Sequence, residues 1–516
     1  MENNTFALSR RVERVFFYFV VFVTTAFLFY PPYLPMVDLP QHAAQVATLD
    51  DLLKNRSPWS YLVTLNWDTP YLAGYALWLL LYQFMNIILS GKVLVASTFL
   101  FYTYTVHLLR KEFQASPLLE WAAMTSFFGF AFQWGFITFL LAIPVGFLFF
   151  LSCKKWLENK KQIYFIYYLI LGIAMYLSHV LIFSFFCFLS YLYFLSVHAG
   201  KQTWKQRIIF TLPYLLYAII LYRYVTKPSE WTFQYYEEGF VFQTLRDKTL
   251  DLFYLPWHML RIYKYQLADY GLLLLFPMLG FRLRRSLEFY IPLIGFLIIW
   301  YILPTIGFQT NFIYQRFSIF LLPFYCLIWE KRQPPYHRKL ISSMQLGAIA
   351  FALCFSTLMW KFYYNQILFS REPAVISYQE IEKAMLPGKR VLTLHTINSR
   401  DSTLAMTSYM EFLYFPTWYQ AEKHGWVDFS FASFHPQIVR FRPEYLRELP
   451  SRSAEIDGIA ALTNCMDYDY LVMKSEEDAQ ILSNHLVTNP HCRLFRLKAQ
   501  SGDWLLFENL HNIKED

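Results

Sequence analysis

Two residues able to transfer protons lie close together just after the first long apolar stretch. Asp38 and His42 are four positions apart, with Pro40 and Gln41 between them. In a helix this spacing puts two side chains on one face. A carboxylate beside apolar residues at a membrane–water interface is partly desolvated and is therefore suited to act as a general base. His42 could be a second acid/base group. The segment predicts proton-transfer chemistry.

A structural interpretation of the same residues stays open. Asp38 with Gln41 three residues later resembles a capping box, and Pro40 suits the first turn of a helix. His42 would then be an interfacial polar residue without a chemical role. The sequence supports both interpretations.

Four further residues could bind an anionic substrate. Arg316 lies at the outer end of an apolar segment, where its guanidinium could fork onto phosphate oxygens or only fix helix depth by snorkelling. His179 lies between two apolar runs at a predicted outer turn, where an ionisable group is a functional candidate. Arg261 and Lys264 are three positions apart and could share a helical face against an anionic lipid headgroup. Mixed charges in a loop are, however, usually a solvated surface.

A metal site and a disulfide are both open questions. Asp38 with Glu237 or Glu238 could hold a divalent cation through carboxylate oxygens, but the sequence does not show that these residues meet. Cys465 and Cys492 could form a disulfide if their segment lies in an oxidising compartment. Two free, half-buried thiols are the alternative.

The composition is that of a membrane protein. Of the residues, 56% are hydrophobic and 21% aromatic, and only 16% are charged, whereas a soluble protein is about a quarter charged. The net charge of +8 most simply reflects Lys and Arg kept in cytoplasmic loops. No nucleic-acid-binding motif is visible, so membrane lipids, and not nucleic acid, are the expected partners.

The apolar stretches predict about eleven transmembrane helices. They lie at 15–35, 71–89, 92–109, 118–152, 163–178, 179–196, 208–225, 268–281, 288–305, 316–329 and 341–361. Within 118–152 we expect one span, preceded by an interfacial or re-entrant helix. Placing the Lys and Arg clusters inside makes the N-terminus cytoplasmic and the tail extracytoplasmic; Arg110-Lys111 is the exception. Two long outer loops follow, at 36–70 and 226–267.

Two substructures would position the candidate residues. Apolar residues recur at helical spacing from Leu39 to Leu53, which predicts an amphipathic helix on the outer membrane surface. The tail, 362–516, has a different texture from the transmembrane part, 1–361. We expect helices at 377–385 and 476–486, strands at 390–395 and 468–473, and a hairpin formed by 493–498 and 504–508. Such alternation predicts a soluble α/β domain, and it contains neither a Gly-rich phosphate loop nor a nucleophile elbow.

The order of these features resembles the GT-C glycosyltransferases. An Asp in the first outer loop, a surface helix, about a dozen spans and a C-terminal extracytoplasmic domain are shared. The segment 37–42 is similar to the Asp-[Tyr/Leu]-Pro-x-His motif of a set of bacterial GT-C-like membrane proteins, and 132–144 is similar to their Trp-Gly-Phe-x-Asn-[Phe/Tyr]-Leu-Leu-Gly stretch. Thr138 and Ala142 depart from that pattern. Leu177-Ser178-His179 and Gln315-Arg316-Phe317 also have counterparts.

The resemblance implies an inverting transferase on the outer face of a bacterial inner membrane. Asp38 would deprotonate an acceptor hydroxyl, and the donor would be a sugar carried on a polyprenyl phosphate. Arg316 would neutralise the departing phosphate. The acceptor, whether lipid, glycan or protein, is not specified. Two other classes stay open: a transporter or flippase of lipid-linked glycans, and a non-catalytic membrane scaffold, which the departures at Thr138 and Ala142 would allow.

Overall fold

The chain folds into two compact units. The computed structural model describes residues 2–226, 239–258, 277, 281–308, 310–331, 338–395, 412–434, 436–445, 465–475 and 479–511. The helical unit comprises Met1–Tyr30, Val93–Lys227 and Tyr235–Tyr364, and the sheet unit comprises Pro31–Lys92, Pro228–Gln234 and Asn365–Asp516. The outer loop 36–70 therefore packs with the tail. The division into a transmembrane and an extracytoplasmic domain stays a prediction.

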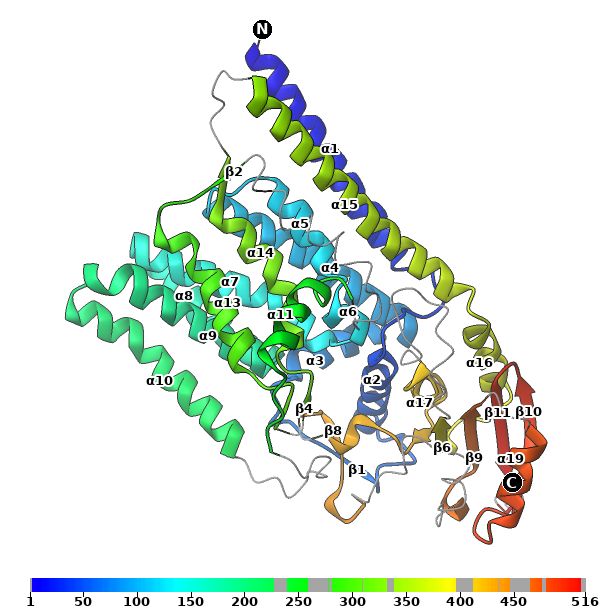
Figure 1. The fold of residues 1–516 in the computed structure, drawn as a ribbon. Helices are drawn as coiled ribbons and strands as arrows, with labels where there is room; N and C mark the ends of the chain where they lie inside the picture. The colour runs from blue at the N-terminus through cyan, green and yellow to red at the C-terminus, as the bar shows by residue number, and fades with distance from the viewer. Residues whose placement is uncertain are drawn as a thin grey trace. The chain divides into compact units, whose positions relative to one another are not determined.

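Apolar helices of different lengths build the helical unit. They are α1 (Glu2–Phe27), α4 (Ile87–Glu112), α7 (Ile137–Asn159), α8 (Gln162–Ser178), α9 (Val180–Tyr193), α10 (Trp204–Thr226), α13 (Ile291–Ile302) and α15 (Arg338–Ser370). Helices α1 and α15 lie side by side (Figure 1). A hydrogen bond between the hydroxyls of Thr24 and Tyr363, which are 2.9 Å apart, joins the two helices.

The structure confirms a polytopic helical membrane fold but not eleven spans. Within the described ranges, four helices are long and apolar enough to cross a membrane: α4, α7, 180–201 and α10. Shorter apolar helices cover 72–82, 162–178, 291–302 and 315–328. The predicted span at 268–281 lies almost wholly outside the described residues. The segment at 316–329 is a short helix, α14 (Leu321–Tyr325), between the 3-10 turns η5 (Gln315–Phe320) and η6 (Cys326–Ile328).

The apolar region 118–152 divides into three helices. They are α5 (Leu118–Ser126), α6 (Phe130–Trp134) and α7. Gly135 ends α6 with φ +91°, a left-handed conformation that favours glycine. A Cβ at Gly129 would lie 2.2 Å from the carbonyl oxygen of Pro256. Two glycines thus separate short helices from one long helix that begins at Ile137, the order expected for one span preceded by a shorter helix.

The sheet unit contains a mixed five-stranded sheet. The strand order is β10 (Phe495–Ser501), β11 (Trp504–Asn509), β9 (Tyr470–Lys474), β6 (Arg390–His395) and β7 (Trp426–Val427). Strand β6 pairs in parallel with β7 and β9, and the β10–β11–β9 part is antiparallel. The helices are α16 (Pro373–Lys383), α17 (Thr417–Lys423) and α19 (Ala479–Thr488). The predicted strands and hairpin are confirmed within two or three residues, and β7 was not predicted.

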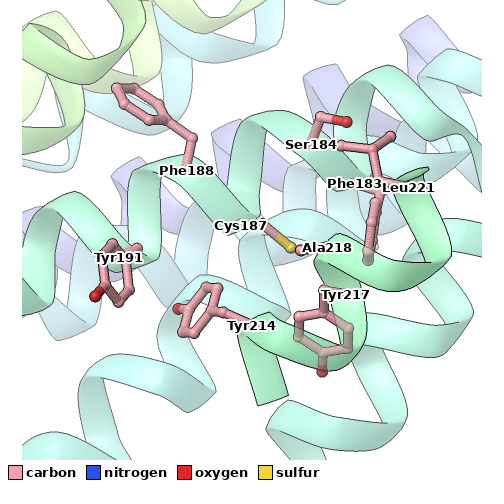
Figure 2. A pocket seen from close by; sticks show the side chains of 9 residues that line it. All are labelled: Phe183, Ser184, Cys187, Phe188, Tyr191, Tyr214, Tyr217, Ala218 and Leu221. Atoms are coloured by element: carbon pink, nitrogen blue, oxygen red, sulfur yellow. The ribbon is translucent and has the colours of Figure 1, made fainter. Parts of the chain in front are cut away.

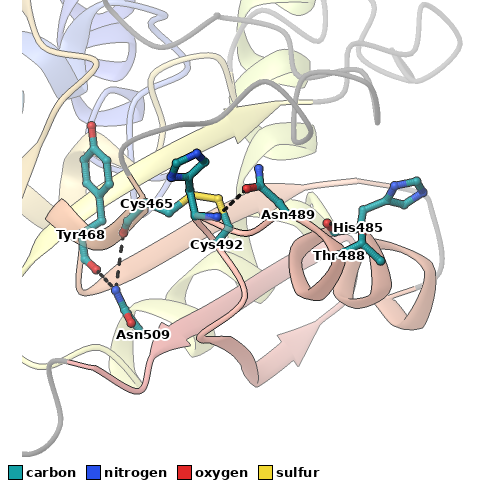
Figure 3. The surroundings of a disulfide bond; sticks show 8 residues. Cys465, Tyr468, His485, Thr488, Asn489, Cys492 and Asn509 are labelled. Carbon is teal, nitrogen blue, oxygen red and sulfur yellow. Dashed lines mark hydrogen bonds between the residues drawn. A yellow bond between two sulfur atoms is a disulfide. The ribbon is translucent and has the colours of Figure 1, made fainter.

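A disulfide joins Cys465 and Cys492 in the core beneath this sheet. Their Cα atoms are 5.1 Å apart, and both residues are buried. The Asn509 side chain donates to the carbonyls of Cys465 and Tyr468 beside the bond (Figure 3). Of the two alternatives left open by the sequence, the structure has the disulfide.

Removing this bond is expected to destabilise the sheet unit. The disulfide closes a loop of 27 residues, and a loop of this length is worth about 3 kcal/mol in the chain-entropy model. Replacing both cysteines by serine should lower the Tm by roughly 6–12 °C, as measured by thermal unfolding. Reductant should shift the wild type similarly and leave the double variant unchanged. A Cys187→Ser variant, which lacks a thiol outside this pair, should retain the reductant response.

Candidate functional site

Helix α2 (Leu39–Leu53) carries His42 and begins directly after Asp38. The predicted helix is confirmed, but its predicted position on a membrane surface is not. Every residue from Leu39 to Asp51 is buried within the sheet unit. The tail covers its polar face, so that this face meets protein and not water.

Two glutamines explain how the polar face is buried. The Gln41 amide donates to the Phe429 carbonyl at 2.7 Å and accepts from the Phe431 N–H at 2.9 Å. Gln45 accepts from the Val439 N–H at 2.9 Å and donates to its carbonyl at 3.1 Å. Each side-chain amide thus donates one hydrogen bond to the tail backbone and accepts one from it, as the backbone of a neighbouring strand would. Nearby, β1 (Val63–Leu65) pairs with β8 (Val439–Phe441).

Asp38 does not cap the helix that it precedes. It occupies the N-cap position with φ −85° and ψ −6°, but its side chain makes no capping hydrogen bond. Gln41, the other half of the expected capping box, is bonded to the tail. Pro40 lies in the first turn as predicted. The capping-box interpretation is therefore wrong, and a carboxylate only 6% exposed lies at the start of α2 for another reason.

His42 is buried in a chain of polar contacts. Its Nδ1 lies 2.8 Å from the hydroxyl of Tyr75 in α3 (Leu72–Tyr82). That hydroxyl donates to Oε1 of Gln437. The Phe431 ring packs edge-on against the imidazole, with centroids 5.3 Å apart. His42 is thus not an exposed interfacial residue. Tyr75 and Gln437 were not found from the sequence.

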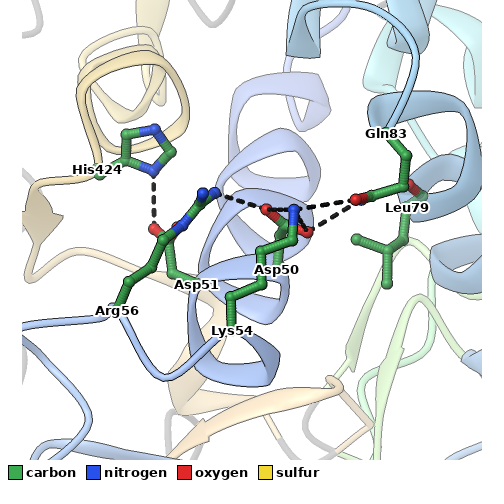
Figure 4. Close-up of polar contacts among 7 residues, drawn as sticks. All are labelled: Asp50, Asp51, Lys54, Arg56, Leu79, Gln83 and His424. Carbon is green, nitrogen blue, oxygen red and sulfur yellow. Dashed lines mark hydrogen bonds and ion pairs between the residues drawn. The ribbon is translucent and has the colours of Figure 1, made fainter.

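The other end of α2 is fixed by charges (Figure 4). Arg56 contacts Asp51 at 2.5 Å and Asp50 at 2.6 Å. Asp51 also contacts Nδ1 of His424 at 2.7 Å. Burial would oppose ionisation of Asp50, but hydrogen bonds from Lys54 and Gln83 outweigh it and lower its pKa. These contacts join α2 to α3 and α17, so the helix that carries His42 is held at both ends.

Arg316 is buried in the helical unit and does not snorkel. Its guanidinium carbon lies 3.7 Å from the centre of the Phe136 ring. Its Nε donates to the Phe312 carbonyl at 3.2 Å and its Nη2 to the Asn311 carbonyl at 2.9 Å. The residue is 8% exposed. Phe136 belongs to the Phe-Gln-Trp-Gly-Phe segment, so two of the predicted motifs meet here.

His179 lies at the turn between α8 and α9, as predicted. It is the N-cap of α9, and its Nδ1 accepts a hydrogen bond from the Leu181 N–H at 3.2 Å. Its ring packs edge-on against Phe139 at 5.3 Å, and Phe139 contacts Phe317 at 5.7 Å. Three motifs that are far apart in the sequence therefore converge in the helical unit.

The remaining predicted residues are not tested. Glu237, Glu238, Arg261 and Lys264 lie outside the described residues. No group of three or more His, Cys, Asp or Glu that could hold a metal occurs among the residues that the structure describes. The divalent cation stays a prediction. Asp38 and His42 belong to the sheet unit, whereas Arg316 and His179 belong to the helical unit.

A pocket of about 260 Å³ lies between α9 and α10 (Figure 2). Aromatic and aliphatic side chains line it, with Cys187, Tyr214 and Tyr217 among them. None of the predicted site residues belongs to its lining. It is therefore separate from the candidate site.

Comparisons with known proteins bear on the fold. No family model matches the sequence, and no curated protein matches it significantly. Among solved structures, the chain is similar to the crystal structure of ArnT from Cupriavidus metallidurans bound to undecaprenyl phosphate. The TM-score is 0.54 at 10% sequence identity, over 98% of this chain and 99% of that chain. A likeness along the whole length of both chains shows that the two share a fold.

Proposed function

We propose that this GT-C-fold protein is a membrane glycosyltransferase that moves a sugar from a polyprenyl-phosphate carrier to a lipid, glycan or protein acceptor. The reaction would take place on the outer face of a bacterial inner membrane. The observation that carries this proposal is the whole-chain likeness to ArnT, a protein whose structure has undecaprenyl phosphate bound. Fold alone does not imply activity, so the proposal also rests on Asp38.

Asp38 is the proposed general base. Its carboxylate would take the proton of an acceptor hydroxyl as that oxygen bonds to the anomeric carbon of the sugar. At the same time the bond from the anomeric carbon to the phosphate oxygen breaks, and the polyprenyl phosphate leaves with the electron pair. Attack opposite the leaving group inverts the anomeric centre. His42, one helical turn on, is the proposed second acid/base group.

Arg316 is the proposed partner of the leaving phosphate. Its guanidinium donates to the Asn311 and Phe312 carbonyls. Those contacts, with the Phe136 ring, fix its plane in advance, which suits bidentate phosphate binding. His179, Arg261 and Lys264 are proposed as further substrate contacts on the same reasoning as in the sequence analysis.

The disulfide supports an extracytoplasmic sheet unit. Such bonds persist in oxidising compartments and are rare in the cytosol. Asp38 and His42 belong to the same unit as Cys465 and Cys492. The proton-transfer residues would then lie outside the cytoplasm, where the distribution of Lys and Arg also predicts the tail.

Sugar transfer by the purified protein tests the proposal. The protein in detergent or liposomes is given a panel of polyprenyl-phosphate sugars and candidate acceptors, and the glycosylated product and the released polyprenyl phosphate are measured. Transfer that depends on both donor and acceptor is the expected result. Movement of a lipid-linked sugar across liposomes that contain no acceptor, without product, would instead favour transport. A folded protein inactive with every donor would contradict the proposal.

A further inference from the structure

A continuous hydrogen-bonded chain leads from His42 into the tail. The His42 Nδ1 lies 2.8 Å from the Tyr75 hydroxyl, and that hydroxyl donates to Oε1 of Gln437. All three side chains are buried. Tyr75 and Gln437 are 362 positions apart, so only the fold brings them together.

The number of protons in this chain determines the state of His42. A tyrosine hydroxyl has one proton, and an amide oxygen can only accept. The Tyr75 proton therefore lies in the bond to Gln437. The Tyr75 oxygen can then meet Nδ1 of His42 only as an acceptor, so Nδ1 carries a proton. In a neutral imidazole the other nitrogen, Nε2, is then the proton acceptor.

Hydrogen bonds hold the backbone of Gln437 and of the residue before it in place. The Asn66 amide donates to its backbone carbonyl at 3.1 Å, and its own N–H donates to the Phe434 carbonyl at 3.3 Å. The Thr69 hydroxyl donates to the carbonyl of the preceding residue, Pro436. Strand β8 follows two residues later and pairs with β1. The backbone at Gln437 is therefore fixed, which keeps its side chain within reach of Tyr75.

We propose that Tyr75 and Gln437 are positioning residues that hold His42 in the Nδ1–H tautomer, so that Nε2 is the proton-accepting nitrogen. The inference rests on the proposed function, in which His42 is an acid/base group. In this state Nε2 is the nitrogen that can take a proton from the acceptor hydroxyl and release it after transfer. The tail would thereby contribute to catalysis without touching the substrate.

Removing the Tyr75 hydroxyl should release this constraint. The Tyr75→Phe change takes away the acceptor for Nδ1–H, so both neutral tautomers become accessible. We expect kcat to fall by about 10- to 100-fold, the size of effect seen for residues that orient a functional histidine, with little change in KM. Gln437→Leu should act like Tyr75→Phe. Gln437→Glu keeps an oxygen that accepts the Tyr75 proton and should retain the tautomer.

The tautomer can be measured without any activity. Protein labelled with ¹⁵N-histidine is compared with a labelled His42→Gln variant, which identifies the His42 signals by difference. The wild type should show a protonated Nδ1 and an unprotonated Nε2, and Tyr75→Phe should show averaged signals. Tyr378→Phe is the matched control, because it removes another buried hydroxyl of the sheet unit, bonded to the Pro416 carbonyl. This control should leave the signals unchanged.

The possible results separate the inference from the proposed function. A protonated Nε2 in neutral wild-type His42 would overturn the inference even if the protein transfers sugar. The expected tautomer with full kcat in Tyr75→Phe would overturn the positioning role alone. If no donor is used, the proposed function fails, and the tautomer measurement still decides how Tyr75 and Gln437 act on His42.

Discussion

The Asp38→Asn variant is expected to transfer sugar about 10²–10⁴-fold more slowly than the wild type, the range over which general bases contribute. Asparagine has nearly the same shape but cannot accept the proton of the acceptor hydroxyl. The Asp38 side chain makes no capping hydrogen bond with α2, so the change should not remove a helix cap. Initial rates of product formation, measured with the best donor of the panel, give the effect, and thermal unfolding checks the fold.

Asp51→Asn is a matched control for this substitution. Asp51 lies on the same helix and is 5% exposed, against 6% for Asp38. Its carboxylate contacts Arg56 and His424, so its loss should lower the Tm while each folded molecule keeps its rate. Equal rates for Asp38→Asn and wild type would remove Asp38 from the mechanism. A rate loss in Asp51→Asn as large as that in Asp38→Asn would show that the assay reports folding.

Local patterns predicted the elements of this chain well, but not their surroundings. The apolar spacing from Leu39 to Leu53 predicted α2, and the alternation at 390–395 predicted β6 with the observed bounds. The same spacing could not show that α2 is covered on both faces. Its polar residues look like a solvated face until Gln41 and Gln45 are seen to bond the tail backbone. Such long-range partners leave no periodic trace in the sequence.

The candidate site was predictable where motifs carried it. The Phe-Gln-Trp-Gly-Phe, Leu-Ser-His and Gln-Arg-Phe segments meet through Phe136, Phe139, His179 and Arg316. Tyr75 could not be found, because a tyrosine in an apolar helix is usually packing. The sequence contains only a weak signal for Gln437, namely that this glutamine lies between Pro436 and the apolar pair Ile438-Val439. The eleven predicted spans are not confirmed within the described residues, and apolar content does not reveal where glycines break a helix.

A buried glutamate, Glu382, and the half-buried Glu422 make the stability of the sheet unit depend on pH. The Tyr33 hydroxyl donates to Oε1 of Glu422 at 3.0 Å. Glu382 on α16 is 6% exposed, and its Oε1 has no hydrogen-bond partner. Lys423, whose charge acts on both glutamates, donates through Nζ to the backbone carbonyls of Glu382 and Met385. Tyr33 lies five residues before Asp38, so this pair holds the segment that leads to the candidate base.

Burial, followed by the charge of Glu422, raises the pKa of Glu382 from 4.5 to about 8. The pKa of Glu422 is also raised, again chiefly by burial. A carboxyl group with a raised folded-state pKa binds its proton more tightly when folded. Its contribution to stability is fully present below pH 4.5 and is lost as the pH rises to about 8. The total loss is on the order of a few kcal/mol.

The Glu382→Gln variant should therefore lose most of this pH dependence. An amide keeps the shape of the protonated acid and does not titrate, so the free energy of unfolding should fall far less between pH 5 and pH 9 than in the wild type. Denaturant titrations at several pH values measure the two slopes. Glu380→Gln, on the same helix but at a half-exposed ion pair with Lys383, should keep the wild-type slope. Equal slopes for Glu382→Gln and wild type would contradict the account. Because Tyr33 links this pair to the Asp38 segment, transfer by the wild type should decline above pH 8 more steeply than transfer by Glu382→Gln.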